Sequence, residues 1–222
     1  MINNDENLLS IAEINDNYLK KIKGSELNIK ARKFIYKISN TTRKKPYVGD
    51  NIIIIWMDKK ADNGLSHTRY PNLICLSEDI LESDIKNVIL HETVHISQRL
   101  YPNEWKIIFK YWNMKAWFGI LPVEINILIR INPDTIMSSL FIWKKRWILL
   151  GLFTSYDTPN IKKIKNVWWD NKKKKLKYIP PKGWNNFFGN IDGEHPYEMA
   201  AYYITQNTDS IACKILHEIL YL

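Results

Sequence analysis

The stretch HETVHISQRL, residues 91–100, constrains the structure of this 222-residue chain more than any other. It places His91 and His95 four residues apart, with Glu92 directly after the first histidine. On an α-helix, residues four apart lie on the same face, so both imidazole rings can reach one metal ion. Glu92 then lies beside the ion without having to bind it, where its carboxylate can accept a proton from water. The spacing therefore predicts a helical metal site with its own general base.

The alternative is a solvated helix that happens to carry two histidines. The chain has five histidines in all, at positions 67, 91, 95, 195 and 217, and two of the five fall into this one motif. Histidine is too scarce here for chance pairing to be the better explanation, so the motif favours the metal site.

A catalytic zinc site needs three protein ligands and one open position. Gln98 and Tyr101 stand where the metzincin pattern requires a glycine and a third histidine. The third ligand is therefore expected to be a carboxylate from a separate helix. Glu198 is the leading candidate, because it lies in the predicted helix HPYEMAAYYITQN (195–207), where the small Ala201 permits close helix packing. Rival third ligands are Asp192, Glu194 and His195.

Taken together, HETVH and the downstream EMAA resemble the gluzincin clan of zincin metallopeptidases. The resemblance implies that His91, His95 and Glu198 bind Zn²⁺, that Glu92 is the general base, and that the substrate is a peptide or protein. It also implies a zincin-like fold, in which the edge strand of a sheet precedes the metal helix and holds the substrate extended. Residues 67–76 occupy that place in the sequence.

One position departs from the gluzincin pattern. Several gluzincins carry an acid four residues after the ligand glutamate, where it bonds a ligand histidine, but this chain has Tyr202 there. A phenol oxygen can accept the same hydrogen bond, and Asp134 and Asp192 are rival partners. Tyr202 and His195 are also candidate catalytic donors to the oxyanion, as are Tyr197 and Tyr203.

A second resemblance concerns RINPDT (130–135), which is followed by WKKRWILLGLF (143–153). This part of the chain resembles unassigned HExxH proteins of large DNA viruses. It implies a viral protein but brings no established substrate.

Hydrophobic periodicity predicts an α+β protein with a single domain over residues 1–222. We expect a small early sheet with an edge strand before the metal helix, and a mostly helical remainder with a late β-hairpin. The expected helices cover 6–23, 26–38, 84–100, 103–118, 195–207 and 209–221. The expected extended segments cover 51–57, 67–76 and 147–153, and the hairpin covers 165–179. The nine tryptophans and twelve tyrosines predict an unusually aromatic core or cleft.

The net charge of +9 raises the possibility of an acidic partner. The densest run, Lys172–Lys175, separates two strand-like pieces, so a solvated hairpin tip is its plain explanation. We expect at most weak, non-specific binding to nucleic acid. The alternative function is a non-catalytic basic binding or virion-associated protein that retains a zincin fold. Glu92 favours the enzyme, because a purely structural zinc site does not need it.

Three features of the sequence predict an intracellular protein, in the cytoplasm or host cell or in a virion: its first residues, its apolar runs and its two cysteines. The stretch MINNDENLLSIAEI (1–14) lacks the basic and then apolar pattern of a secretory signal. No uninterrupted apolar run is long enough for a membrane span. Cys75 and Cys213 make neither a disulfide framework nor a paired-cysteine zinc site.

Overall fold

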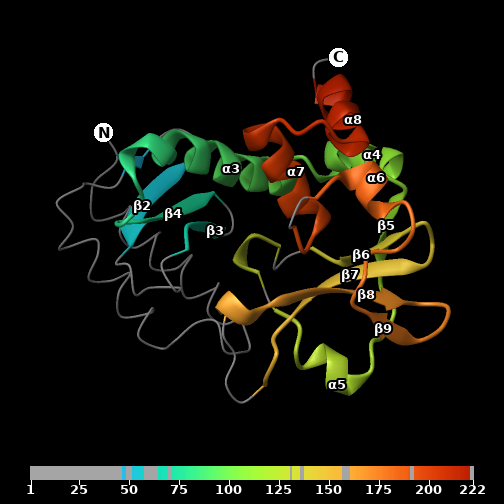
Figure 1. The fold of residues 1–222 in the computed structure, drawn as a ribbon. Helices are drawn as coiled ribbons and strands as arrows, with labels where there is room; N and C mark the ends of the chain where they lie inside the picture. Colours follow the sequence, from blue (N-terminus) through green and yellow to red (C-terminus); the bar gives the residue numbers. More distant parts are fainter. Residues whose placement is uncertain are drawn as a thin grey trace. The chain divides into compact units, whose positions relative to one another are not determined.

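The computed structural model describes residues 47–48, 52–57, 65–69, 72–130, 132–135, 138–156, 161–190 and 193–220 (Figure 1). The helices predicted over 6–23 and 26–38 lie outside the described residues. The chain divides into two compact units: unit 1 comprises Met1–Ile96 and Ile131–Ile136, and unit 2 comprises Ser97–Arg130 and Met137–Leu222. The α+β class is confirmed, and the single domain stays a prediction.

Unit 1 contains a four-stranded sheet in the order β1-β2-β4-β3 (Figure 1). Its strands are β1 (Tyr47–Val48), β2 (Ile53–Met57), β3 (His67–Arg69) and β4 (Leu73–Ser77). β2 and β4 are parallel, whereas β1 and β3 pair antiparallel with their neighbours, which leaves β3 at an edge of this sheet. The strand predicted over 51–57 is confirmed.

The single extended segment predicted over 67–76 is wrong, because it consists of two strands. β3 and β4 pair antiparallel, with His67 opposite Cys75. Pro71 lies between them and has no N–H to contribute to a continuous ladder, which is a local reason for the strand to end.

Helix α3 (Glu82–Leu100) follows β4 and confirms the helix predicted over 84–100, with two more residues at its start. Ile96 joins Ile74 and Leu76 of β4 in a buried cluster, and Val88 and Ile89 pack against it. Ile96 lies seven and eight residues after Ile89 and Val88, about two helical turns on, so the three side chains share one helix face. The packing fixes the rotation of α3 about its axis and therefore where its histidines point.

Unit 2 is built on a five-stranded antiparallel sheet in the order β5-β6-β7-β8-β9. The strands are β5 (Met114–Trp117), β6 (Leu140–Trp143), β7 (Trp147–Leu152), β8 (Lys165–Asp170) and β9 (Lys175–Lys177). The strand predicted over 147–153 and the hairpin predicted over 165–179 are confirmed. The mostly helical remainder is wrong, because the hairpin is one end of this larger sheet.

The helix predicted over 103–118 also ends early. α4 (Pro102–Tyr111) is followed by Asn113 in the left-handed region, at φ 57°, and the chain then enters β5. Asparagine tolerates this conformation better than most residues, so the chain can leave the helix here. β5 then pairs with β6.

Both faces of the unit 2 sheet are covered. Leu121 and Ile125, on and before α5 (Val123–Asn126), pack against Ile148 and Leu150 of β7. On the other side, Trp143 contacts Trp184 of α6 (Trp184–Phe188), with ring centroids 5.2 Å apart. The predicted aromatic core is confirmed in this unit.

The remaining helices of unit 2 are α7 (Pro196–Gln206) and α8 (Ile211–Leu220), which confirm the helices predicted over 195–207 and 209–221. Two short 3₁₀ turns, η2 (Pro133–Thr135) in unit 1 and η3 (Ile161–Lys163) in unit 2, complete the described elements. Within the described ranges, no helix is both long and apolar enough to cross a membrane.

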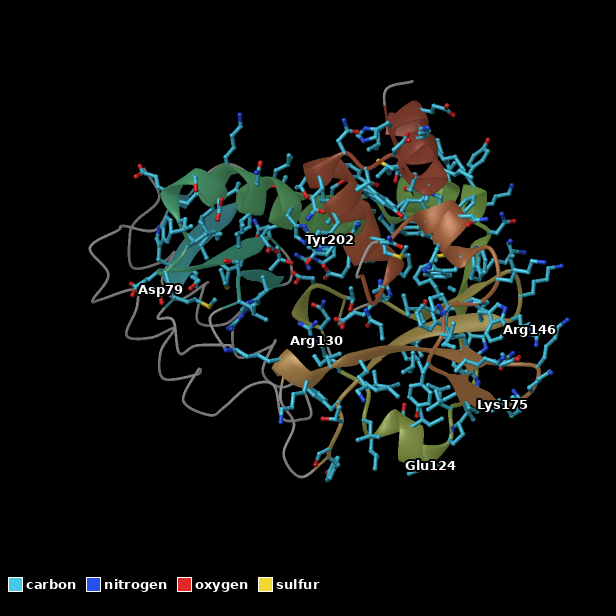
Figure 2. All side chains as sticks on the ribbon, in the orientation of Figure 1. Asp79, Glu124, Arg130, Arg146, Lys175 and Tyr202 are labelled. Atoms are coloured by element: carbon cyan, nitrogen blue, oxygen red, sulfur yellow. The ribbon has the colours of Figure 1, made fainter. Side chains whose placement is uncertain are left out.

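Asp170 holds the lysine-rich tip of the β8–β9 hairpin. Its carboxylate accepts hydrogen bonds from Nε and Nη2 of Arg146 at 3.0 and 2.7 Å, and from the backbone N–H groups of Lys172 and Lys173. Figure 2 labels Arg146 and Lys175 at this end of the sheet. The Arg146 hydrogen bonds, assisted by these N–H groups, hold the pKa of the Asp170 carboxyl well below its usual range. The solvated hairpin tip predicted for Lys172–Lys175 is therefore a tightly held turn.

We expect Asp170→Asn to lower the free energy of unfolding by about 1–3 kcal/mol at neutral pH, because it weakens charge-assisted hydrogen bonds to a buried side chain. A carboxyl whose pKa is depressed on folding contributes stability above its unfolded pKa, and the contribution is lost as the pH falls. The gap between wild type and variant should therefore shrink as the pH is lowered below about 4. Urea unfolding across this range measures it. Glu124→Gln, at an exposed acid of the same unit, is the control, and a gap that widens in acid would contradict this account.

Candidate metal site

His91 and His95 point their ring tips at each other from one face of α3. Their Nε2 atoms lie 3.1 Å apart, and their rings meet edge-on with centroids 4.9 Å apart. His95 is fully buried, whereas His91 is partly exposed. The two nitrogens can share one proton, or they can bind one cation.

The separation fits a zinc ion. Two imidazole nitrogens at about 2.0–2.1 Å from Zn²⁺, at a tetrahedral angle, lie about 3.3 Å from each other. The observed 3.1 Å is within a few tenths of an ångström of that value. Both nitrogen tips can therefore reach one tetrahedral ion with little movement of the side chains.

Glu92 lies in the same part of unit 1 and is 3% exposed. One oxygen of Glu92, one ring nitrogen of His95 and one oxygen of Asp134 all lie within 4.8 Å of one another. The sequence motif predicted Glu92 beside the histidines. Asp134 was one of two rival partners predicted from the sequence for a ligand histidine. Asp192, the other rival, lies outside the described residues.

Asp134 connects this cluster to the edge strand β3. Its Oδ1 accepts hydrogen bonds from the backbone N–H of Thr68 at 2.7 Å and from the Thr68 hydroxyl at 2.6 Å. Asn132 shapes the turn by accepting a hydrogen bond from the Asp134 N–H through its side chain, at 2.9 Å. A carboxylate fixed in this way can orient a neighbouring imidazole, as partners of ligand histidines do in zinc sites.

We expect Asp134→Ala to lower the free energy of unfolding by about 1–3 kcal/mol, because it leaves the buried N–H and hydroxyl of Thr68 without their acceptor. Asp134→Asn should cost less, since its amide oxygen can still accept from Thr68. Chemical denaturation measures both variants, with Glu78→Ala on the exposed surface of unit 1 as the control. Equal and negligible losses for the two variants would show that the Thr68 contact contributes nothing.

The other polar residues of β3 are buried. Arg69 donates from Nε to Nε2 of His67 at 3.1 Å, and His67 donates from Nδ1 to the carbonyl of Leu65 at 3.0 Å. His67 and Arg69 are 2% and 1% exposed, so neither side chain is open to a substrate along this strand. Their buried hydrogen bonds stabilise the edge strand.

Glu198 belongs to unit 2, where it lies in the first turn of α7 and is 7% exposed. Its role as the third ligand stays a prediction. Within unit 2, a hydrogen bond is made to the residue just before Glu198. The side-chain amide of Gln98, in the last turn of α3, donates to the carbonyl of Tyr197 at 3.0 Å.

The rival ligands Glu194 and His195 have other contacts in unit 2. Glu194 accepts a 2.6 Å hydrogen bond from Nη1 of Arg130. Gly151 makes room for this pair, because a Cβ there would lie 2.5 Å from Oε2 of Glu194. His195 is the N-cap of α7, where its Nδ1 accepts from the N–H of Tyr197, and its Nε2 lies 3.1 Å from the carbonyl oxygen of Ser139. Both nitrogens of His195 are therefore engaged, which favours a structural role over ligation or oxyanion binding.

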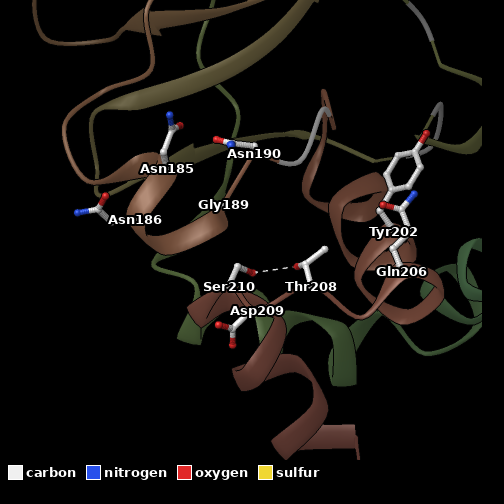
Figure 3. A pocket seen from close by; sticks show the side chains of 9 residues that line it. All are labelled: Asn185, Asn186, Gly189, Asn190, Tyr202, Gln206, Thr208, Asp209 and Ser210. Atoms are coloured by element: carbon white, nitrogen blue, oxygen red, sulfur yellow. Dashed lines mark hydrogen bonds between the residues drawn. The ribbon is translucent and has the colours of Figure 1, made fainter.

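The candidate tyrosines have different surroundings in unit 2. Tyr203 donates its hydroxyl to the carbonyl of Phe188 at 2.6 Å, and burial raises its pKa above the ordinary range, so it is a core residue. Burial also raises the pKa of Tyr197, which stacks on Phe109. Tyr202 lines a polar pocket (Figure 3), and its catalytic role stays a prediction.

The link between Asp134 and Thr68 is the contact that local sequence patterns missed. Asn132-Pro133 is a recognisable turn signal, but nothing in it indicates that the next residue bonds a strand 66 positions earlier. In comparisons with known proteins, no family model, no curated protein and no solved structure matches this chain.

Proposed function

We propose that this chain is a zinc-dependent metallopeptidase of zincin type, in which His91, His95 and Glu198 hold the metal and Glu92 is the general base. One observation carries the proposal. The Nε2 atoms of His91 and His95 face each other at 3.1 Å on one helix face, close to the spacing that a tetrahedral zinc ion requires.

The support for Glu198 is the anchoring of its helix. Gln98 lies three residues after His95 on α3, and it bonds the carbonyl of Tyr197, the residue just before Glu198. Glu198 is also nearly buried and carries a carboxylate, which is one of the ligand types that zinc accepts.

Zinc, when bound, supplies a Lewis acid that lowers the pKa of a water molecule and polarises the scissile carbonyl. Glu92 accepts a proton from the attacking water and returns it to the leaving amine. Glu92 is buried beside His95, which keeps its carboxylate away from bulk water. Asp134, fixed by Thr68, has a carboxylate oxygen within 4.8 Å of a His95 ring nitrogen, from where it can orient that ring.

The edge strand β3 is not open to a substrate backbone. An extended peptide can add to the edge of a sheet through main-chain hydrogen bonds, but the Thr68 N–H of β3 already donates to Asp134 and all three residues of β3 are buried. Because Thr68 in β3 bonds Asp134, which lies beside His95 and Glu92, the edge strand and the catalytic residues are held in one arrangement.

The proposed function predicts chelator-sensitive hydrolysis of an unfolded protein. Purified chain should cleave reduced, denatured casein, lose this activity in 1,10-phenanthroline, and regain it on addition of Zn²⁺. The 1,7-isomer of phenanthroline does not chelate and is the matched control, and a serine-protease inhibitor excludes a common contaminant. Cleavage that proceeds unchanged in 1,10-phenanthroline would contradict a metal-dependent mechanism.

The alternative of a basic binding protein rests on the lysine run. Lys172–Lys175 are exposed on the β8–β9 turn, where they are open to any polyanion. A short cluster of this kind supports weak, salt-sensitive association, and it leaves the buried Glu92 unexplained.

A further inference from the structure

Unit 2 contains a pocket of about 620 Å³ that the peptidase proposal does not use (Figure 3). Three segments line it: the first half of α6 with the two residues after the helix, the second half of α7, and the loop 208–210 that leads into α8. Figure 3 shows Asn190 and Gln206 on opposite sides of the space, with Thr208 and Ser210 below them. The volume is in the range of small-molecule sites.

The floor of the pocket is fixed by hydrogen bonds. Ser210 is 8% exposed, and its Oγ accepts from the N–H of Cys213 at 3.1 Å and from the Thr208 hydroxyl at 3.4 Å. Gly189, at φ +70°, brings the end of α6 onto this floor, because a Cβ there would lie 3.4 Å from Cβ of Ser210. The serine that caps α8 therefore also sets the depth of the pocket.

The lining is polar but almost free of charge. Among the described residues, no lysine or arginine lines the pocket, so an anionic ligand would find no cation. The one acid in the lining, Asp209, lies 2.6 Å from Nζ of Lys214 in a solvated pair, so a cationic ligand would compete with that lysine. The remaining polar groups are amides and hydroxyls.

Those groups match a neutral ligand that carries several hydroxyls. Asn190 and Gln206 each offer an amide donor and a carbonyl acceptor side by side, whereas the side chains of Asn185 and Asn186 point away from the space between them (Figure 3). A pair of adjacent sugar hydroxyls donates and accepts in the same way. Tyr202, half-buried at the rim, adds an aromatic face against which the C–H groups of a sugar ring can pack.

From this lining we propose that the pocket binds a neutral carbohydrate, of the size of a mono- or disaccharide. The amides of Asn190 and Gln206 bond its hydroxyls from two sides, and the ring lies over the Ser210 floor. This site is separate from the proposed zinc chemistry, because its lining contains none of the three proposed zinc ligands and not Glu92.

Saturation-transfer difference NMR on the full chain tests the proposal. The probes are D-glucose, D-galactose, D-mannose and N-acetyl-D-glucosamine, each at millimolar concentration. We expect transfer to the ring protons of at least one sugar, and a loss of affinity of about ten-fold or more in the double variant Asn190→Ala/Gln206→Ala, since each lost hydrogen bond costs about 1 kcal/mol. Asn126→Ala, at an exposed asparagine outside the pocket, should bind like wild type.

Three results would overturn the carbohydrate site. The first is no transfer from wild-type protein to any of the four sugars. The second is equal transfer in wild type and in a double variant whose circular dichroism shows the native fold. The third is transfer to glycinamide, a probe of peptide amides, or a response to inorganic phosphate, without transfer to a sugar. Because wild type alone can give the first and third results, the test stands even if the double variant does not fold.

Discussion

Glu92→Gln should reduce casein hydrolysis by about 10²–10⁴-fold while the protein keeps its fold and its zinc. The amide has the shape of the carboxylate but cannot accept the proton of the attacking water. His91 and His95 are untouched by the change, so metal binding should persist. Initial rates with equal amounts of zinc-loaded wild type and variant measure the effect.

The matched control is Glu82→Gln, a change of the same kind at an exposed glutamate in the first turn of the same helix. It should hydrolyse casein like wild type. If the Glu92 variant cleaved at the wild-type rate with zinc bound, Glu92 would not be the base and the mechanism would be wrong.

His95→Ala and Glu198→Ala should each weaken zinc binding by more than about 10²-fold, the upper end of what loss of an outer-shell partner costs. Each removes one of three proposed ligands, and a zinc site with two protein ligands holds the metal poorly. Competition with a chromogenic chelator measures the affinity.

Glu194→Ala is the control within the same segment, since its carboxylate is already bonded to Arg130. It should bind zinc as wild type does. Loss of zinc in Glu194→Ala together with retention in Glu198→Ala would show that Glu194, and not Glu198, is the third ligand. The resemblance to the gluzincin pattern would then fail.

The parts of the fold that sequence could predict are those in which a local pattern repeats. α3 was predictable because Val88, Ile89 and Ile96 lie at helical spacing on one face, where Ile96 is buried and the other two are partly buried. The approach of His91 and His95 follows from the same spacing, because helix geometry alone places residues four apart together. The α7 boundary was likewise marked by Pro196, which suits the first turn of a helix.

The five-stranded sheet could not be read in the same way. β5 and β6 are four residues each, too short for a clear period. Lys144 and Lys145 turn between β6 and β7 at φ 48° and 57°, where glycine or asparagine is the usual signal. Without that signal the turn between β6 and β7 could not be recognised. The late hairpin and the strand over 147–153 were therefore predicted without β5 and β6, which belong to the same sheet.

Local sequence patterns did not predict the contacts that a site residue makes with residues distant in the sequence. Asp134 bonds Thr68 across 66 positions, and no local pattern records such a pair. His195 was predicted as a catalytic donor or rival ligand because histidine suits both, yet its ring caps α7. Residue type indicated the chemistry available, and the roles predicted for His195 stay predictions beside the cap that its ring forms.

Zinc content is the measurement that tests the account most directly. The chain should be purified without chelators and its metal content determined by elemental analysis against protein concentration. The account predicts close to one zinc per chain, together with X-ray absorption that gives two histidine nitrogens at about 2.0–2.1 Å and a carboxylate oxygen at about 2.0–2.2 Å. A chain that contains no zinc, and takes up none when zinc is supplied, would contradict it.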